Sequence, residues 1–114
     1  MEKIDAEIYA RIDNNVYKKQ GDIWWKPHSV LHLIKTSLNP WRLEYADMIF
    51  KKLGFDARGK TALEVGSGGG ILCEEICKMG FITTGIEPAQ ESITTASNHA
   101  KTSGLNIKYE QGTG

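Results

Sequence analysis

The segment from Thr61 to Ile71 has four glycines within five positions, directly after a run of small and apolar residues. The run predicts a buried strand, and the glycines predict a turn too tight for side chains. In an open α/β sheet, ligands bind beyond the carboxyl ends of the strands, where a glycine-rich turn lets backbone amides approach them. The sequence therefore predicts a ligand-binding loop that leads into a helix.

The spacing of the glycines does not fit a dinucleotide. A dinucleotide-binding loop has a third glycine five positions after the first, and that position, counted from Gly66, holds Ile71. The chain instead has an acidic residue and alternating glycines at Glu64, Gly66, Gly68 and Gly70. An ionised carboxylate at the end of a buried strand needs a partner, because leaving it unpaired away from water is costly. A cationic ligand would provide that partner.

A second acidic residue follows the loop at a separation typical of nucleotide sites. Glu87 ends a second apolar run, 21 residues after Gly66. A carboxylate at the tip of the second strand is placed to accept hydrogen bonds from both hydroxyls of a ribose. The alternative is structural: glycine-rich turns also occur without ligands, and Glu87 could favour the start of the next helix through its dipole.

The second half of the chain alternates strands and helices. We expect strands over residues 61–65, 81–86 and 106–110, with helices over 71–79 and 88–103 between them. Right-handed crossovers give a parallel sheet with the strand order 3-2-1. The sequence thus predicts an α/β half-sheet over residues 58–114, preceded by a helical segment over residues 1–57.

Three helices are expected in the N-terminal segment. An apolar residue at every fourth position predicts an amphipathic helix over residues 3–20, and a short helix is expected over 29–37. Asn39 and Pro40 predict the cap and first turn of a third helix, which Gly54 ends. The apolar stripe of this third helix is expected at Leu43, Ala46, Ile49, Phe50 and Leu53.

Arg42 lies in the first turn of that third helix. A cation is unfavourable there because of the helix dipole, unless an anionic group lies opposite it. A ligand carboxylate could be that group, and the simpler alternative is a solvated surface arginine.

Three residue pairs allow more than one interpretation. Trp24 and Trp25 could cap the mouth of the site, line an acceptor pocket, touch a lipid surface or pack against the first helix. Two further pairs have helical spacing of four, His28 with His32 and Cys73 with Cys77. Neither pair is accompanied by enough other ligands for a zinc site, so no metal site is predicted.

Charge and hydropathy exclude several classes of function. The 14 basic and 14 acidic residues balance, and no basic patch interleaved with aromatics indicates nucleic-acid binding. No apolar run approaches the roughly 20 residues of a membrane span, and the N-terminus lacks the apolar segment of a secretory signal. A cytoplasmic protein is expected.

The motif at Glu64, Gly66, Gly68 and Gly70 resembles the first motif of class I S-adenosylmethionine-dependent methyltransferases. Trp24-Trp25, the segment Leu38-Asn39-Pro40-x-Arg42-Leu43-x-Tyr45 and the segment 63–72 are similar to the ubiquinone-biosynthesis O-methyltransferase family. In that family the matching arginine, first glycine and second-strand acid bind S-adenosylmethionine. The resemblance implies this role for Arg42, Gly66 and Glu87, with Arg42 at the methionine carboxylate. The neighbouring loop residues of the implied cofactor site are Glu64, Ser67, Gly68 and Gly70.

The resemblance implies a Rossmann-like class I methyltransferase fold and transfer of a methyl group to oxygen on a small aromatic or quinone-like acceptor, leaving S-adenosylhomocysteine. Lys26, Ser67 and residues 27–37 depart from the pattern of the ubiquinone enzymes. A nitrogen, carbon or lipid acceptor is therefore an alternative, as is a non-catalytic binding fragment. Contact with a membrane surface is a further expectation.

A full domain of this family has further strands, one of them beside the first strand. Without them Ala62, Leu63 and Val65, which have the character of interior residues, would lie on an edge strand, and such an edge favours association. We therefore expect a half-domain that is either truncated or completed by a second chain, that can associate through this edge and that is inactive alone. No catalytic residue is assigned.

Overall fold

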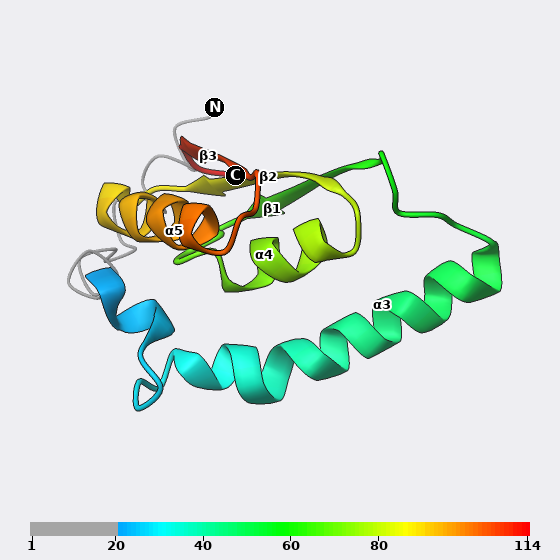
Figure 1. The fold of residues 1–114 in the computed structure, drawn as a ribbon, viewed down its shortest axis with the longest axis horizontal. Coiled ribbons are helices and arrows are strands. Elements are labelled where there is room, and N and C mark those ends of the chain that lie inside the picture. Colours follow the sequence, from blue (N-terminus) through cyan, green and yellow to red (C-terminus); the bar gives the residue numbers. More distant parts are fainter. Residues whose placement is uncertain (1–20) are drawn as a thin grey trace, which may run out of the picture.

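The computed structural model describes residues 21–114 as a three-stranded parallel sheet with helices packed against it (Figure 1). The strands are β1 (Thr61–Val65), β2 (Ile82–Glu87) and β3 (Lys108–Gln111), in the order β1-β2-β3. Helix α4 (Ile71–Lys78) connects β1 to β2, and α5 (Gln90–Thr102) connects β2 to β3. The predicted order 3-2-1 is confirmed. The helix expected over residues 3–20 lies outside the described residues.

The carboxyl ends of β1 and β2 are held together where the glycine-rich turn begins. Val65 pairs with Ile86 in the parallel register. The backbone N–H groups of Gly66 and Ser67 both donate to the carbonyl of Ile86, at 2.8 and 3.0 Å. The tip of β2 therefore lies directly beside the turn that leaves β1.

Helices α3, α4 and α5 all lie on the same side of the sheet (Figure 1). On α5, the predicted inward residues Ile93, Ala96 and Ala100 are buried. On β2, alternate residues are buried, as expected of a strand with one covered face.

Leu63 and Val65 do not lie in the interior of the described structure. They are 59% and 56% exposed, and Ile82 on the neighbouring strand is 61% exposed. The reason is the period of two along a strand: Ala62 and Glu64 are partly buried, and the residues between them point the other way. The interior position expected for Leu63 and Val65 is therefore wrong for the described residues.

The helix before the sheet is longer and more continuous than predicted. A π-helical turn, η2 (Ile34–Leu38), runs directly into α3 (Asn39–Leu53). Asn39 has helical backbone angles and its N–H donates to the carbonyl of Ile34, so it does not cap a separate helix. A helix that continues through Pro40 must give up one N–H donor and avoid a clash with the preceding turn. The wider π-type turn just before the proline provides that room.

The end of α3 follows the prediction at one residue and departs from it at another. Gly54 ends the helix with a left-handed φ of 65°, as expected of a C-terminal glycine. Leu53, assigned to the apolar stripe, is 73% exposed. Phe50 and Phe55 form an aromatic cluster with Phe81, which ties this end of the helix to the start of β2.

None of the helices within residues 21–114 is both long enough and apolar enough to cross a membrane.

Candidate functional site

The turn after β1 has the backbone conformation that its glycines predict. Gly66, Gly68 and Gly70 have φ angles of 75°, 54° and 85°, in the left-handed region that other residues rarely adopt. A side chain at Gly68 would also collide with the Trp24 ring, whose Cη2 lies 2.6 Å from the position of such a Cβ. Both the path of this turn and the ring above it therefore require glycine.

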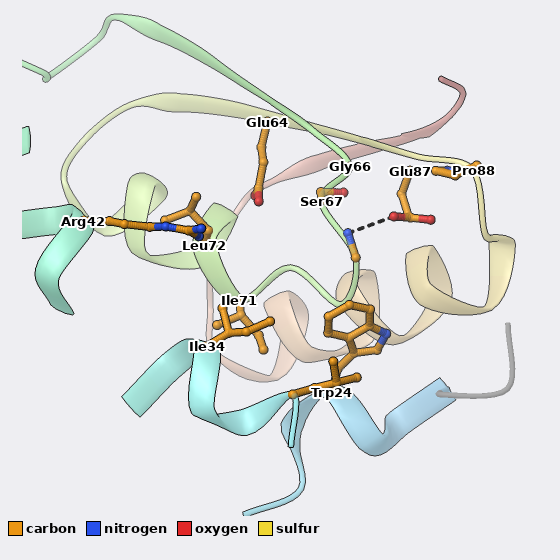
Figure 2. A pocket seen from close by; sticks show the side chains of 12 residues that line it. Trp24, Ile34, Arg42, Glu64, Gly66, Ser67, Ile71, Leu72, Glu87 and Pro88 are labelled. Atoms are coloured by element: carbon orange, nitrogen blue, oxygen red, sulfur yellow. Dashed lines mark hydrogen bonds between the residues drawn. The ribbon is translucent and has the colours of Figure 1, made fainter. Parts of the chain in front are cut away.

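A cavity of about 400 Å³ opens beside this turn, at the carboxyl ends of β1 and β2 (Figure 2). Six of the seven predicted cofactor residues line it: Arg42, Glu64, Gly66, Ser67, Gly68 and Glu87. Apolar side chains complete the lining, contributed by Trp24, Leu31, Ile34, Ile71, Leu72 and Pro88. Residues from four separate parts of the chain thus meet at one site.

Gly70 is the predicted site residue that does not line the cavity. It is buried, and a Cβ built on it would collide with the hydroxyl of Tyr109 and lie 3.1 Å from the Cβ of Ala96. It also stands at the N-cap of α4. Its position fits a packing role, between the start of α4 and strand β3.

Glu87 connects the tip of β2 to the glycine-rich turn. Its side chain is only 7% exposed. Oε1 accepts a hydrogen bond from the Gly68 N–H at 3.1 Å, and Oε2 accepts one from the Ala89 N–H at 2.7 Å (Figure 2). Each carboxylate oxygen can accept more than one hydrogen bond, so the carboxylate retains capacity for a ligand hydroxyl.

Glu64 is a partly buried carboxylate with a weak donor as its partner. The Cys73 thiol donates to Oε2 of Glu64 at 2.9 Å. Burial raises the pKa of Glu64, while the Cys73 hydrogen bonds and the charge of Arg42 oppose that shift. Burial likewise raises the pKa of the Cys73 thiol. A cationic ligand group near Glu64 would favour its ionised form.

Arg42 projects from α3 into the cavity (Figure 2). Within residues 21–114 no acidic side chain forms an ion pair with it. Because the helix begins before α3, Arg42 does not lie at a helix start, and the dipole argument for an anionic partner is wrong. The argument that remains is its position: a guanidinium lining the cavity is available to an anionic ligand group.

Ser67 carries a polar atom that no protein group in the described structure satisfies. The residue is 5% exposed, and its Oγ is buried without a hydrogen-bond partner. An unsatisfied buried hydroxyl is costly, and this Oγ lies 2.8 Å from the position of a Cβ built on Gly85, so it faces strand β2.

The tryptophan pair covers the glycine-rich turn. Trp24 is 7% exposed, lies against Gly68 and Gly69, and donates from Nε1 to Ser92 Oγ at 3.2 Å. Trp25 donates from Nε1 to the carbonyl of Gly69 at 2.8 Å. Of the alternatives left open by the sequence, this geometry supports cover of the site, and packing against the first helix concerns residues outside the described range. Only the adjacency of the two rings marked them in the sequence, and adjacency does not reveal what they cover.

The histidine and cysteine pairs do not form a metal centre. No group of three or more His, Cys, Asp or Glu side chains in residues 21–114 is arranged to hold a metal ion. Cys73 is buried against Glu64, and the Cys77 thiol lies 3.8 Å from the carbonyl of Asn106. His28 is exposed, and the buried Nδ1 of His32 has no hydrogen-bond partner among residues 21–114.

Sequence comparison identifies relatives of this chain. Residues 63–114 match the methyltransferase domain family. A ubiquinone biosynthesis O-methyltransferase of Azorhizobium caulinodans is 34% identical over 117 residues, covering 96% of this chain and 44% of the relative. One from Pasteurella multocida is 40% identical over 95 residues, covering 83% of this chain and 37% of the relative. The chain thus spans less than half the length of these curated relatives.

Solved structures with the same fold are more distant in sequence. A complex of DhpI with SAM and HEP superposes with a TM-score of 0.54 at 19% identity, covering 96% of this chain and 42% of that one. The PH0226 protein from Pyrococcus horikoshii gives a TM-score of 0.52 at 24% identity, covering 69% of this chain and 34% of that one. These similarities concern the fold.

Proposed function

Because residues 63–114 match the methyltransferase domain family and the chain is 34–40% identical to ubiquinone biosynthesis O-methyltransferases, we propose that its cavity binds S-adenosylmethionine and the demethylated product S-adenosylhomocysteine. When bound, S-adenosylmethionine supplies a sulfonium methyl group that a nucleophile can accept. The described residues bind and orient this cofactor, and none of them is assigned a role in the transfer itself.

The charges of the cavity match those of such a ligand. Glu64 and Glu87 are carboxylates on the sheet side, and Arg42 is a cation on α3. S-adenosylmethionine has an ammonium and a sulfonium, which suit Glu64, and a carboxylate, which suits Arg42. Glu87, held by two backbone N–H groups, is suited to accept hydrogen bonds from the ribose hydroxyls.

The observation that carries this proposal is the meeting of both carboxylates and the arginine beside the glycine-rich turn in one cavity. A volume of about 400 Å³ lies within the range of small-molecule and cofactor sites. A glycine-rich turn that merely closed a loop would not need such a convergent set of charges.

For the acceptor, we propose oxygen on a small aromatic or quinone-like molecule. The support is the set of curated relatives that are ubiquinone biosynthesis O-methyltransferases. Leu31 and Ile34, from the segment that departs from the family pattern, contribute apolar surface to the cavity. Methyl transfer by the whole protein, inactivity of residues 1–114 alone and a cytoplasmic location stay predictions.

Calorimetric titration of the chain with S-adenosylhomocysteine tests the cofactor site. We expect measurable binding that Arg42→Ala and Glu87→Ala each weaken by roughly tenfold or more, since hydrogen bonds to charged groups contribute about 1.5–3 kcal/mol. Lys52→Ala and Glu91→Ala, which change exposed charges on α3 and α5 outside the cavity, are the matched controls. Absence of binding, or equal affinity in all four variants, would overturn the assignment.

A second candidate function is a binding fragment that folds fully only with a partner and transfers no methyl group. The exposed apolar residues Leu63, Val65 and Ile82 on one side of the sheet favour it. Binding of S-adenosylhomocysteine by the chain without any added partner would count against this alternative.

A further inference from the structure

Trp25 holds a backbone carbonyl of the glycine-rich turn without lining the cavity. Its indole Nε1 donates to the carbonyl of Gly69 at 2.8 Å, across 44 positions in the sequence. The residue is partly buried, and the cavity lining includes Trp24 but not Trp25. Any effect of Trp25 on a ligand must therefore act through the turn.

The Trp25 ring is itself held in place from α5. It stacks on the imidazole of His99, with ring centroids 3.4 Å apart and planes inclined by 4°. Lys35 Nζ lies 5.2 Å from the centroid of the same indole, a cation–π contact. An aromatic ring fixed by a stacked neighbour has few other orientations, so its N–H stays aimed at the carbonyl.

The imidazole of His99 also contacts a buried carboxylate on α4, the helix that follows the glycine-rich turn. His99 Nδ1 lies 2.5 Å from Oε2 of Glu74, whose residue is only 1% exposed. The Glu74 backbone N–H in turn donates to the carbonyl of Gly70 at 3.0 Å. These contacts therefore form a closed path. It begins at Gly69, runs through Trp25, His99 and Glu74, and ends at Gly70, the next residue of the same turn.

We propose that Trp25 is a positioning residue for the cofactor site. His99 and Glu74 orient the Trp25 ring, and its N–H then fixes the Gly69 carbonyl and the shape of the glycine-rich turn. This inference rests on the proposed function, since the shaped turn is the one that would hold S-adenosylmethionine. If the turn leaves its binding shape for part of the time, the apparent affinity falls by the fraction lost. Trp25 thus affects binding without touching the ligand.

The first test replaces Trp25 by phenylalanine, which keeps an aromatic ring for the stack but removes the N–H together with the five-membered ring of the indole. We expect Trp25→Phe to weaken S-adenosylhomocysteine binding by about three- to tenfold, the range that corresponds to one neutral hydrogen bond. Trp41→Phe removes an indole N–H at a 75% exposed position on α3 and should leave the affinity unchanged. Phe55→Leu, in the aromatic cluster outside the cavity lining, controls for a general loss of stability.

A double-mutant cycle separates positioning from packing. His99→Gln removes the stacked ring and keeps a side chain that can bond to Glu74. If His99 acts through Trp25, the double variant Trp25→Phe/His99→Gln should bind no more weakly than the weaker single variant. Additive losses would overturn the link between the two residues, and an affinity for Trp25→Phe equal to that of the wild type would overturn the proposal as a whole.

Hydrogen exchange of the Trp25 indole N–H gives a readout that needs no ligand. The exchange should be slow in the wild type and faster in His99→Gln, while the indole N–H of exposed Trp41 is fast in both. Unchanged exchange at Trp25 would contradict its orientation by His99. Failure of the wild type to bind S-adenosylhomocysteine would instead count against the proposed function, so the two failures are distinguishable.

Discussion

Gly68 donates its backbone N–H to the carboxylate of Glu87, 19 residues later in the chain and on the neighbouring strand. The same carboxylate accepts the N–H of Ala89 at the start of the next helix region. One side chain therefore fixes the tip of β2, the glycine-rich turn and the approach to α5. The two interpretations of Glu87 that the sequence left open, a structural role and a ligand role, are compatible in this geometry.

Replacing Glu87 by glutamine should both loosen this connection and weaken ligand binding. The amide keeps the size of the side chain, but its NH₂ group cannot accept the hydrogen bond that one backbone N–H now makes. Leaving a buried donor unsatisfied costs about 1–3 kcal/mol, and we expect the free energy of unfolding in urea to fall by that amount. Glu91→Gln, at an exposed position on α5, should change it by less than about 0.5 kcal/mol. Equal stability of the two variants would contradict the structural role of Glu87.

Replacing Glu64 by glutamine should stabilise the ligand-free chain at neutral pH. Burial raises the pKa of Glu64 above its ordinary value of 4.5, so the folded chain binds this proton more tightly than the unfolded chain does. The stabilisation from protonation is present below that ordinary value and is lost as the pH rises through the raised pKa. Glutamine is neutral at every pH, so its advantage should be present near pH 7, shrink as the pH falls through the raised pKa, and be absent below about pH 4.5.

Urea unfolding at several pH values checks the prediction for Glu64. A variant less stable than the wild type near pH 7 would contradict it. The same variant should bind S-adenosylhomocysteine more weakly, because the attraction between the carboxylate and the ligand ammonium is lost. Such a gain in stability with a loss of binding is common at functional sites.

Gly70→Ala should destabilise the fold far more than Gly104→Ala. Both glycines have left-handed φ angles, 85° and 69°, and that conformation costs an alanine about 1–2 kcal/mol. At Gly70 the new Cβ would also collide with Tyr109, whereas at Gly104 nothing lies within 4 Å. With overpacking added, we expect a loss of about 3 kcal/mol for Gly70→Ala, measured by urea unfolding. Similar losses in the free energy of unfolding at the two positions would show that the Tyr109 side chain moves to make room for the new methyl group.

The exposed apolar side of the sheet should make residues 1–114 associate in solution. Leu63, Val65 and Ile82 are all more than half exposed, and β1 is an edge of the described sheet. We expect the mass from size-exclusion chromatography with light scattering to rise with concentration, and the double variant Leu63→Thr/Val65→Thr to reduce that rise. Threonine keeps the strand propensity and lowers the apolar surface. A monomer at all concentrations would contradict this prediction.

The sequence predicts the parts of this fold that depend on local pattern. Glycines at 66, 68 and 70 need left-handed backbone, and the strand order follows from the alternation of strands and helices with right-handed crossovers. Six predicted residues meet in the cavity because the carboxyl ends of neighbouring parallel strands lie together. Their roles toward a cofactor stay predictions.

The parts that the sequence does not predict depend on contacts between distant residues. Asn39 has the composition of a helix cap, yet the π-type turn before it keeps the helix continuous, which a residue preference does not reveal. Leu63 and Val65 are apolar, and only the position of the helices decides which side of their strand is covered. Trp25 meets Gly69 and His99 through tertiary packing, so no spacing in the sequence indicates that arrangement.

The unbroken helix from Ile34 to Leu53 is a stiff rod about 30 Å long. Ile34 lines the cavity, and α3 extends from there toward the opposite end of the molecule (Figure 1). One continuous element therefore joins the cavity, at Ile34, to the aromatic cluster of Phe50, Phe55 and Phe81 at the start of β2.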